Sequence, residues 1–473
     1  MNEIQHSLQK PDYNRNLIVF VLISGAFVSL LNQTLLIIAL PPVMTDFGID
    51  ANAAQWLTTA FLLTNGILIP VTAFLIDRFS SKKLLIVANL LFAAGTLIGA
   101  LAPTFPVLLL ARVVQAAGAG MMMPLMQTVL LTIFPMNRRG SVMGLVGLAI
   151  GFAPAIGPTL SGWVLSHHSW RALFYIILPL AALNIILAST VMKNVTEQKE
   201  VRIDLLSIVL STLGFGGLLY AFSSVGAAGW TSPAVAGSFL VGAVSLYLFI
   251  RRQLRLDPPM LNFSVFRVGV YKLIVPMGMI VFALLIGTET ILPLYVQQVR
   301  SGTALQSGLL LLPGAVAMGA MSPVAGRIFD RVGPGVLAIT GFGLQVLTTI
   351  PFVLMDEQTP LVWLGAVFAV RMAGLSMLMM PLSTAGINSL PRQLIAHGTA
   401  MDNTFRQVGG SIGTALLVSV MTGSAAIVHA STDRAALMSG VRISFIVAGV
   451  LAVAGLFLAI RLRASVQTRT SGE

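Results

Sequence analysis

The sequence predicts an all-α integral membrane protein, and three observations support this prediction. First, 56% of the 473 residues are hydrophobic and only 9% are charged, with a mean hydropathy of +0.91; soluble domains carry about 25% charged residues. Second, long apolar runs recur along the whole chain, each close to the roughly 20 residues that a helix needs to cross a bilayer. Third, two widely separated segments share one motif, which indicates two related halves.

Fourteen apolar runs are long enough to cross the membrane. The seventh and eighth runs are diluted by Gly and Ser, so a chain with twelve spans is the alternative if this pair does not cross. An even number of spans keeps most of the 28 Lys and Arg residues on one side. The predicted spans cover residues 16–40, 54–76, 84–102, 106–133, 141–165, 172–192, 204–226, 234–250, 271–296, 305–326, 336–355, 360–387, 399–428 and 440–461.

Short basic clusters between the runs set the predicted orientation. Lys and Arg accumulate in the cytoplasmic loops of membrane proteins, and the clusters here include Lys82 with Lys83 and Arg138 with Arg139. We therefore expect a multi-pass protein of the cell (cytoplasmic) membrane with both termini in the cytoplasm. The polar start of the chain shows no signal peptide pattern. The net charge of +12 does not predict binding to nucleic acid, because the bases form no continuous basic face.

The composition and the missing motifs exclude several kinds of chemistry. The chain has no Cys, so disulfides and thiolate metal sites are excluded. It contains no HExxH metal motif and no GxxxxGK[ST] nucleotide-binding loop. We expect no metal and no cofactor, and we expect an ion gradient to supply the energy, with H⁺ favoured and Na⁺ left open.

The shared motif relates the two ends of the chain. AFLIDRFSSKK (73–83) ends the second predicted span, and GRIFDRVGPG (326–335) ends the tenth. Their acids, Asp77 and Asp330, lie 253 residues apart, and Arg112 in the fourth span lies 259 residues before Arg371 in the twelfth. A nearly constant offset predicts two six-helix halves with two extra helices between them. Repeated halves with a binding site at their interface are characteristic of secondary transporters.

The repeat defines the predicted domains. The expected fold has two pseudo-symmetric six-helix bundles plus two additional central transmembrane helices. The predicted segments are a cytoplasmic N-terminal tail (1–15), an N-terminal bundle (16–192), a linker with the two extra helices (193–270), a C-terminal bundle (271–461) and a cytoplasmic tail (462–473).

Three motifs give the chain a family resemblance. AFLIDRFSSKK, LLLARVVQAAGAG (108–120) and GLAIGFAPAIGPTLSG (147–162) resemble motifs of the major facilitator superfamily, and more narrowly those of its fourteen-helix branch of drug–proton antiporters, the multidrug efflux type. The resemblance covers roughly residues 16–463 and implies the major facilitator fold. The third segment resembles the antiporter motif of helix five, which implies export instead of uptake.

The first predicted helix departs from the pattern of that branch. Its sequence is LNQTLLIIALP (31–41), so Asn32 stands where the branch usually has an acid. A mechanism that depends on an acid at this position is therefore not transferred to this chain.

A single acid, Glu289, lies well inside the predicted span 271–296. An ionised carboxylate at the centre of a bilayer costs about 2.5–3.5 kcal/mol. In a partly dry cavity the carboxyl can instead hold a proton at neutral pH and release it when a cationic substrate enters. We expect Glu289 to be the main proton carrier. Asp402 is a weaker candidate for proton coupling, because Arg406 at i+4 makes a plain internal ion pair the more favoured interpretation.

Two further groups of residues are predicted to serve transport. A substrate cavity between the halves is expected to contain polar, aromatic and flexible Met side chains: Asn32, Gln33, Trp56, Phe61, Arg112, Gln115, Met123, Phe152, Glu289 and Met377. Conformational gating is expected from charges at helix ends, and from Gly and Pro that permit close packing and bending: Asp77, Arg78, Lys82, Asp330, Arg331, Gly147, Gly151, Pro154, Gly157 and Pro158.

The favoured function is therefore proton-coupled export of lipophilic, often cationic, drugs or toxic compounds by alternating access. Its expected partners are small-molecule substrates, protons and the lipid bilayer, and the protein is expected to work as a monomer. The first alternative is export of a specific lipid-like or other metabolite, which the same motifs would serve. A membrane-embedded enzyme is a remote alternative, because no acid–base or metal constellation is visible in the sequence.

Overall fold

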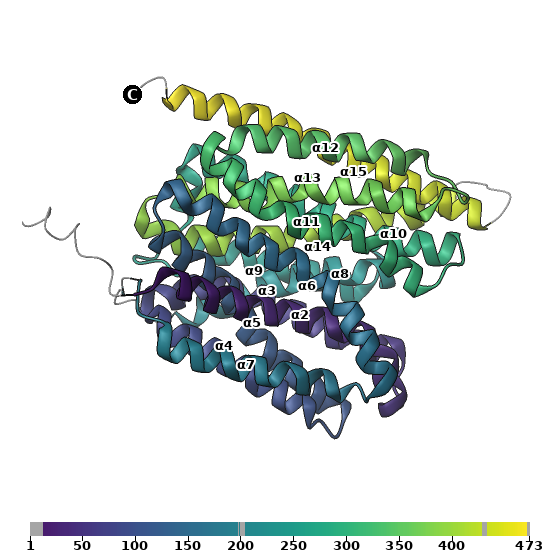
Figure 1. Cartoon of the computed structure of the whole chain (residues 1–473), viewed down its shortest axis with the longest axis horizontal. Helices are drawn as coiled ribbons and strands as arrows, with labels where there is room; N and C mark the ends of the chain where they lie inside the picture. Colours follow the sequence, from purple (N-terminus) through teal and green to yellow (C-terminus); the bar gives the residue numbers. More distant parts are fainter. Residues whose placement is uncertain (1–12, 197, 199–203, 428–432, 471–473) are drawn as a thin grey trace, which may run out of the picture.

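The computed structural model describes residues 13–196, 198, 204–427 and 433–470. In this part of the chain the secondary structure is helical, without strands, and fourteen long helices run side by side (Figure 1). The long helices are α2 (Arg15–Phe47), α3 (Ala51–Arg78), α4 (Ser81–Ala100), α5 (Phe105–Ile133), α6 (Arg139–His167), α7 (Arg171–Val191), α8 (Leu205–Ala228), α9 (Pro233–Gln253), α10 (Gly269–Leu294), α11 (Ala304–Val332), α12 (Pro334–Leu354), α13 (Leu361–Asn388), α14 (Ile395–Ile427) and α15 (Asp433–Thr470). One-turn segments lie between some of them: η1 (Met136–Arg138), η2 (Phe263–Arg267), η3 (Tyr295–Val299) and η4 (Arg392–Leu394).

The helices match a membrane environment. Thirteen of those described are long and apolar enough to cross a bilayer, and α8 and α9 are among them. The remaining long helix, α14, contains the charged residues Asp402 and Arg406 in its first half. The prediction of an all-α membrane fold with fourteen long helices is therefore confirmed, and the twelve-span alternative is not supported.

The two halves pack their helices in the same way. In the first half, α2 packs on α6, α3 on α5, and α4 on α7; in the second half, α10 packs on α14, α11 on α13, and α12 on α15. The order of partners is the same in both sets, which is the structural form of the sequence repeat. Figure 1 shows the first half in purple and blue and the second half in green and yellow.

The extra helices α8 and α9 form a hairpin that also contacts both halves. They approach closely at Gly217 and Gly242, and α8 packs against both α3 and α14. An ion pair of 2.7 Å joins Asp204, just before α8, to Arg252 near the end of α9. The hydrogen bonds from Arg252 hold the pKa of Asp204 at about 2, against the opposing effect of burial. The hairpin is thus tied together at one end and lies beside the α3–α14 contact.

Small residues let α6 and α11 approach each other across the boundary between the halves. A Cβ added at Gly144 would lie 2.8 Å from the carbonyl oxygen of Ser322, and one added at Gly151 would lie 2.6 Å from the backbone nitrogen of Gly319. Real Cβ atoms do not approach backbone atoms this closely, so these positions require Gly. Small residues at such positions are typical of tightly packed helices in membranes.

The two halves are in contact at one end of the molecule. We call the end at which α2 begins and α15 ends the terminal end, and the opposite end the far end (Figure 1). Contacts between α6 and α11 run from Gly140 at the terminal end to Gly151, whereas Gly157 faces Thr34 in its own half. Nearer the far end, Trp163 and Leu305 are 61% and 72% exposed.

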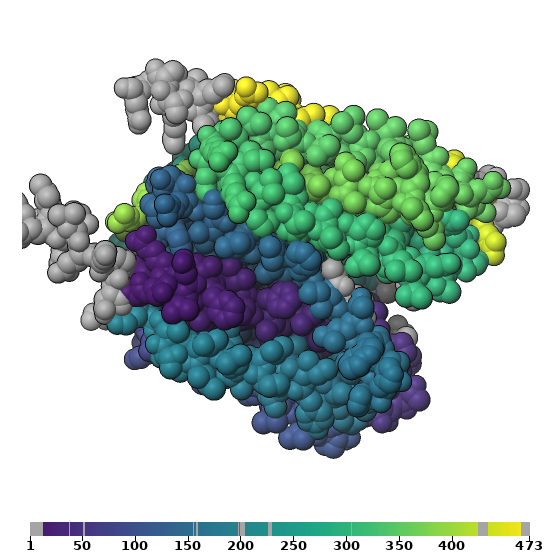
Figure 2. All heavy atoms as spheres, viewed as in Figure 1, coloured from purple at the N-terminus to yellow at the C-terminus, as the bar shows by residue number. Residues whose placement is uncertain are grey.

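The second boundary, between α3 and α14, is also packed at the terminal end. Asp77 meets His397 at the terminal end, and a Cβ on Gly66 would lie 3.8 Å from Gln407 farther along the same pair of helices. The halves therefore pack together at the terminal end and separate toward the far end, as Figure 2 shows.

A first test concerns the close approach of α6 and α11. Gly151→Ala places a methyl group against the backbone of α11, and overpacking of this kind destabilises a protein by about 1–3 kcal/mol. We expect a lower melting temperature for the purified variant in detergent. Gly162→Ala is the matched control on the same helix, because nothing lies within 4 Å of the position its Cβ would take. Equal melting temperatures for both variants would contradict the described packing.

Candidate functional site

Asp330, at the end of α11, joins the halves through the first turn of α6. One carboxylate oxygen accepts the backbone N–H of Gly140 at 2.7 Å, and the other accepts the N–H of Ser141 at 2.8 Å and its hydroxyl at 2.5 Å. The first N–H groups of a helix have no partner within the helix, and the helix dipole favours a negative charge there. Asp330 therefore acts as an N-terminal cap supplied by the other half. Arg331, next to it, is exposed.

Asp77, at the end of α3, occupies the corresponding place in the first half. Its buried carboxylate lies 3.1 Å from Nε2 of His397, in the first turn of α14. The ring nitrogen Nδ1 of His397 lies 3.4 Å from the backbone nitrogen of Asn262. Each half thus contributes one acid at the terminal end that reaches the start of a helix in the other half.

The two basic gating candidates of the first motif lie beside this contact. Arg78 places its guanidinium 5.7 Å from the centroid of the Phe79 ring. Lys82 is half-buried in the first turn of α4.

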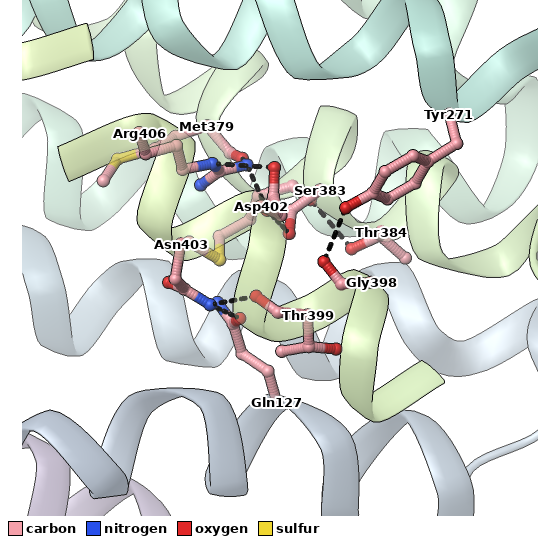
Figure 3. A network of polar contacts seen from close by, with 11 residues as sticks. Gln127, Tyr271, Met379, Ser383, Thr384, Gly398, Thr399, Asp402, Asn403 and Arg406 are labelled. Atoms are coloured by element: carbon pink, nitrogen blue, oxygen red, sulfur yellow. Dashed lines mark hydrogen bonds and ion pairs between the residues drawn. The ribbon is translucent and has the colours of Figure 1, made fainter. Parts of the chain in front are cut away.

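Two polar pairs that sequence reasoning did not identify also connect the halves. Asn403 of α14 donates to the side-chain oxygen of Gln127 in α5 at 2.6 Å, as Figure 3 shows. Arg139 donates to the side-chain oxygen of Asn388 at 2.6 Å. Gln127 could have been noticed in the sequence, because a polar side chain deep in an apolar run needs a partner inside the protein.

Four of the predicted cavity residues form a buried network in the first half. Arg112 donates to the carbonyl oxygen of Leu57 at 3.3 Å and to the side-chain oxygen of Gln115 at 2.8 Å, and its guanidinium lies 4.2 Å from the Phe61 ring centroid. Gln115 in turn donates to Asn32 at 3.4 Å. All four side chains are buried. In this arrangement they hold α2, α3 and α5 together.

Arg371 forms the counterpart of this network in the second half. It donates to the hydroxyls of Thr288 at 3.3 Å and Thr349 at 3.0 Å, and to the backbone oxygen of Gln345 at 3.2 Å. Within the described residues, its second terminal nitrogen has no hydrogen-bond partner. Thr288 directly precedes Glu289 in the sequence, so Arg371 contacts the neighbour of the predicted proton carrier.

Glu289 lies in the part of α10 nearer the far end and is half-buried. No residue of the described chain forms a hydrogen bond or an ion pair with it. Gly287, two residues before it, packs against Leu417 of α14, which lies farther toward the far end than Gln407, the residue beside Gly66 of the first half. Ten residues separate Leu417 from Gln407, or roughly 15 Å of helix. Glu289 therefore lies farther toward the far end than the contact between Gly66 and Gln407.

Asp402, the second candidate for proton coupling, has several partners. It lies 3.1 Å from Arg406, and it accepts the hydroxyl of Ser383 at 2.6 Å (Figure 3). Arg406 also donates to the backbone oxygen of Met379 at 2.9 Å. The acid and the base are both buried, and each satisfies the other.

The remaining cavity candidates lie in different places. Trp56 is 42% exposed and stacks on Tyr220 of α8, with the ring centroids 5.9 Å apart. Phe152 covers Gly319 at the boundary between α6 and α11. Met377 faces α12, because its sulfur accepts the hydroxyl of Thr340 at 3.7 Å. Gln33 and Met123 are half-buried, and no hydrogen bond to either is found in the described chain.

The gating candidates of α6 divide between two neighbours. Gly147 faces Ser322 of α11, on the same side as Gly151, whereas Gly157 faces Thr34 of α2. Pro154 is exposed, and the side chain of Pro158 lies outside the described residues. Glycine thus brings α6 close to the other half near the terminal end and to its own half near the far end.

Comparison with known proteins places this architecture in a family. Residues 22–414 match the Major Facilitator Superfamily. The chain is 60% identical to the uncharacterized MFS-type transporter YcnB of Bacillus subtilis, over 97% of each chain. It is 40% identical to the lincomycin resistance protein LmrB of Listeria monocytogenes, over 94% of this chain and 96% of that one.

A solved structure has the same fold. The human organic anion transporter MFSD10 (TETRAN) superposes with a TM-score of 0.70 at 14% identity, and the match covers 95% of this chain and 100% of that one. At this identity the likeness concerns the fold alone. Together with the matches in sequence, it leads to one conclusion: the chain belongs to the major facilitator superfamily of membrane transporters.

Proposed function

We propose that the protein exports lipophilic, often cationic, small molecules across the cell membrane in exchange for protons. The observation that carries the proposal is Glu289, a half-buried acid without a hydrogen bond or ion pair among the described residues, in the part of α10 toward the far end, where the halves separate. The name of the lincomycin resistance protein, a relative 40% identical to this chain, supports a drug as the cargo.

The physical argument concerns the charge of Glu289. Outside water, an ionised carboxylate without a partner costs several kcal/mol, so the acid binds either a proton or a positively charged group. Proton and cationic substrate then compete for one negative site. Because each ligand favours a different charge state, binding of one promotes release of the other. The pH gradient across the membrane gives this exchange its direction.

Alternating access would proceed by opening the terminal end while the far end closes. Asp330 would leave the first turn of α6, and Asp77 would separate from His397. Because Gly144 and Gly151 have no side chains, α6 and α11 can separate and pack together again without side chains having to rearrange at these positions. Asp402 is the proposed second proton site, used only when its ion pair with Arg406 is broken.

The proposed orientation places the terminal end in the cytoplasm. The basic clusters of the loops at this end support it, since Lys and Arg accumulate on the cytoplasmic side. In that orientation the structure is open to the outside. Because one chain contains both halves and their boundary, we propose that a monomer is sufficient for transport. The substrate cavity is proposed to lie between the halves, in contact with Glu289 and with Phe152.

The first test of the function is transport in proteoliposomes with an imposed pH gradient. For Glu289→Gln we expect loss of proton-driven efflux of cationic compounds, because the amide cannot exchange a proton. Glu289→Asp is the matched control: it keeps the acid and should retain part of the activity.

Three outcomes separate the candidate functions. Loss of cation efflux alone supports the proposal. If instead one neutral or anionic compound is exported equally well by both variants, export of a specific metabolite becomes the better description. Unchanged gradient-driven efflux of every cation by Glu289→Gln would remove this residue from its proposed role.

A second test addresses the contact made by Asp330. In Asp330→Asn the amide nitrogen faces hydrogen-bond donors, so at least one charge-assisted bond of about 1.5–3 kcal/mol is lost. The population closed at the terminal end should fall about tenfold or more relative to the open one. Because the chain contains no Cys, spin labels on Trp163→Cys and Leu305→Cys can report the width of the far end, which should become narrower.

The matched control for this measurement is Asp50→Asn. Asp50 caps its own helix, α3, through the N–H of Ala53 at 2.7 Å, and within the described residues it forms no hydrogen bond or ion pair with the other half. It should leave the distance distribution unchanged. The same distribution for Asp330→Asn as for the wild type would show that the Asp330 contact does not hold the terminal end closed.

A further inference from the structure

A cavity of about 510 Å³ lies at the terminal end, at the boundary between the two halves. One wall comes from the first half, from the end of α5 through η1 to the start of α6, and the other comes from the last turns of α11. The lining residues are Phe134, Asn137, Arg138, Ser141, Val142, Arg327, Asp330 and Arg331. The cavity is therefore complete only while the terminal end is closed.

The charge of this cavity is strongly positive. Three of its residues are Arg and one is Asp, which gives a formal charge of +3 − 1 = +2. The single carboxylate, Asp330, is already engaged by two backbone N–H groups and a hydroxyl of α6. The three guanidinium groups are exposed, and no hydrogen bond or ion pair to them is found in the described chain. Three cations thus face one cavity whose single acid bonds to α6.

The chemistry of the lining indicates the ligand. Guanidinium groups bind phosphate with good geometry, often through two parallel hydrogen bonds. Phe134 and Val142 add an apolar part to the wall, which suits the glycerol and upper acyl region of a lipid. Basic pockets between transmembrane helices at a membrane face are suited to anionic lipid head groups.

We propose that this cavity binds a phosphate group, carried by an anionic phospholipid, through Arg138, Arg327 and Arg331. Because Arg138 belongs to the first half and the other two belong to the second, the bound phosphate bridges the halves. The lipid then favours the arrangement that is closed at the terminal end. This inference is independent of the transported substrate and of Glu289.

Binding is tested first, with purified protein and short-chain phosphatidylglycerol. Each Arg contributes about a fivefold gain in affinity for an anionic head group, so Arg327→Gln/Arg331→Gln should bind about 25-fold more weakly than the wild type. The matched control is Arg255→Gln/Arg267→Gln, which removes the same charge from exposed positions outside the cavity. Arg327→Lys/Arg331→Lys retains the charge and should recover much of the affinity.

Inorganic phosphate, added without lipid, forms the second arm of this experiment. If it binds with the same dependence on Arg327 and Arg331, the site is a phosphate site that a free anion also occupies, which supports the proposed chemistry. If the cavity and control variants weaken phosphatidylglycerol equally, and neither affects inorganic phosphate, the proposal is overturned, because general surface charge would then explain the binding.

The conformational consequence is measured with spin labels at Trp163→Cys and Leu305→Cys in nanodiscs. Replacing part of the phosphatidylcholine by phosphatidylglycerol should increase the fraction with a wide far end in the wild type and in the Arg255→Gln/Arg267→Gln control. The Arg327→Gln/Arg331→Gln variant should not respond. An equal response of all three proteins would overturn the bridging role.

Discussion

The closed contact between the two halves at the terminal end is the interaction on which the rest of the structure depends. Glycine lets α6 and α11 touch along their backbones, and Asp330 adds a charge where the helix has free N–H groups. Both interactions exist only while the terminal end is closed. Once the halves separate, the backbones of α6 and α11 lose contact and Asp330 no longer caps α6. In this structure the halves are packed together at the terminal end and apart at the far end.

Each half contains a buried Arg whose partners lie within the same half. Arg112 and Arg371 are completely buried, and their described partners are carbonyl oxygens, hydroxyls, a side-chain amide and aromatic rings. In a bilayer such groups find their partners within the protein: Arg112 joins α5 to α3, and Arg371 joins α13 to α10 and α12. Glu289 differs from them, because the described chain gives it no partner. A carboxyl group without a partner in its own bundle is suited to bind a proton or a cationic substrate reversibly.

Much of the fold could be predicted from the sequence, because the bilayer imposes a length and a composition on each span. The fourteen helices and the repeat of Asp77 and Asp330 follow from that constraint and from spacing. Contacts between side chains could not be predicted in the same way. The partner of Asp77, His397, lies 320 residues later in the chain, and the pair of Gln127 and Asn403 depends on which faces of α5 and α14 meet. Met377 illustrates the same limit: its residue type suits a binding surface, but the packing of α12 on α13 turns it toward Thr340.

The most direct test of the central claim is proton release on substrate binding. Purified protein in weakly buffered detergent solution would receive a lipophilic cation, and the change in pH would be recorded together with the amount of cation bound. If Glu289 exchanges a proton for the cation, each binding event should release a proton at a pH where the carboxyl is protonated, and the release should be absent in Glu289→Gln. Binding of the cation by the wild-type protein without any release of protons would contradict the account.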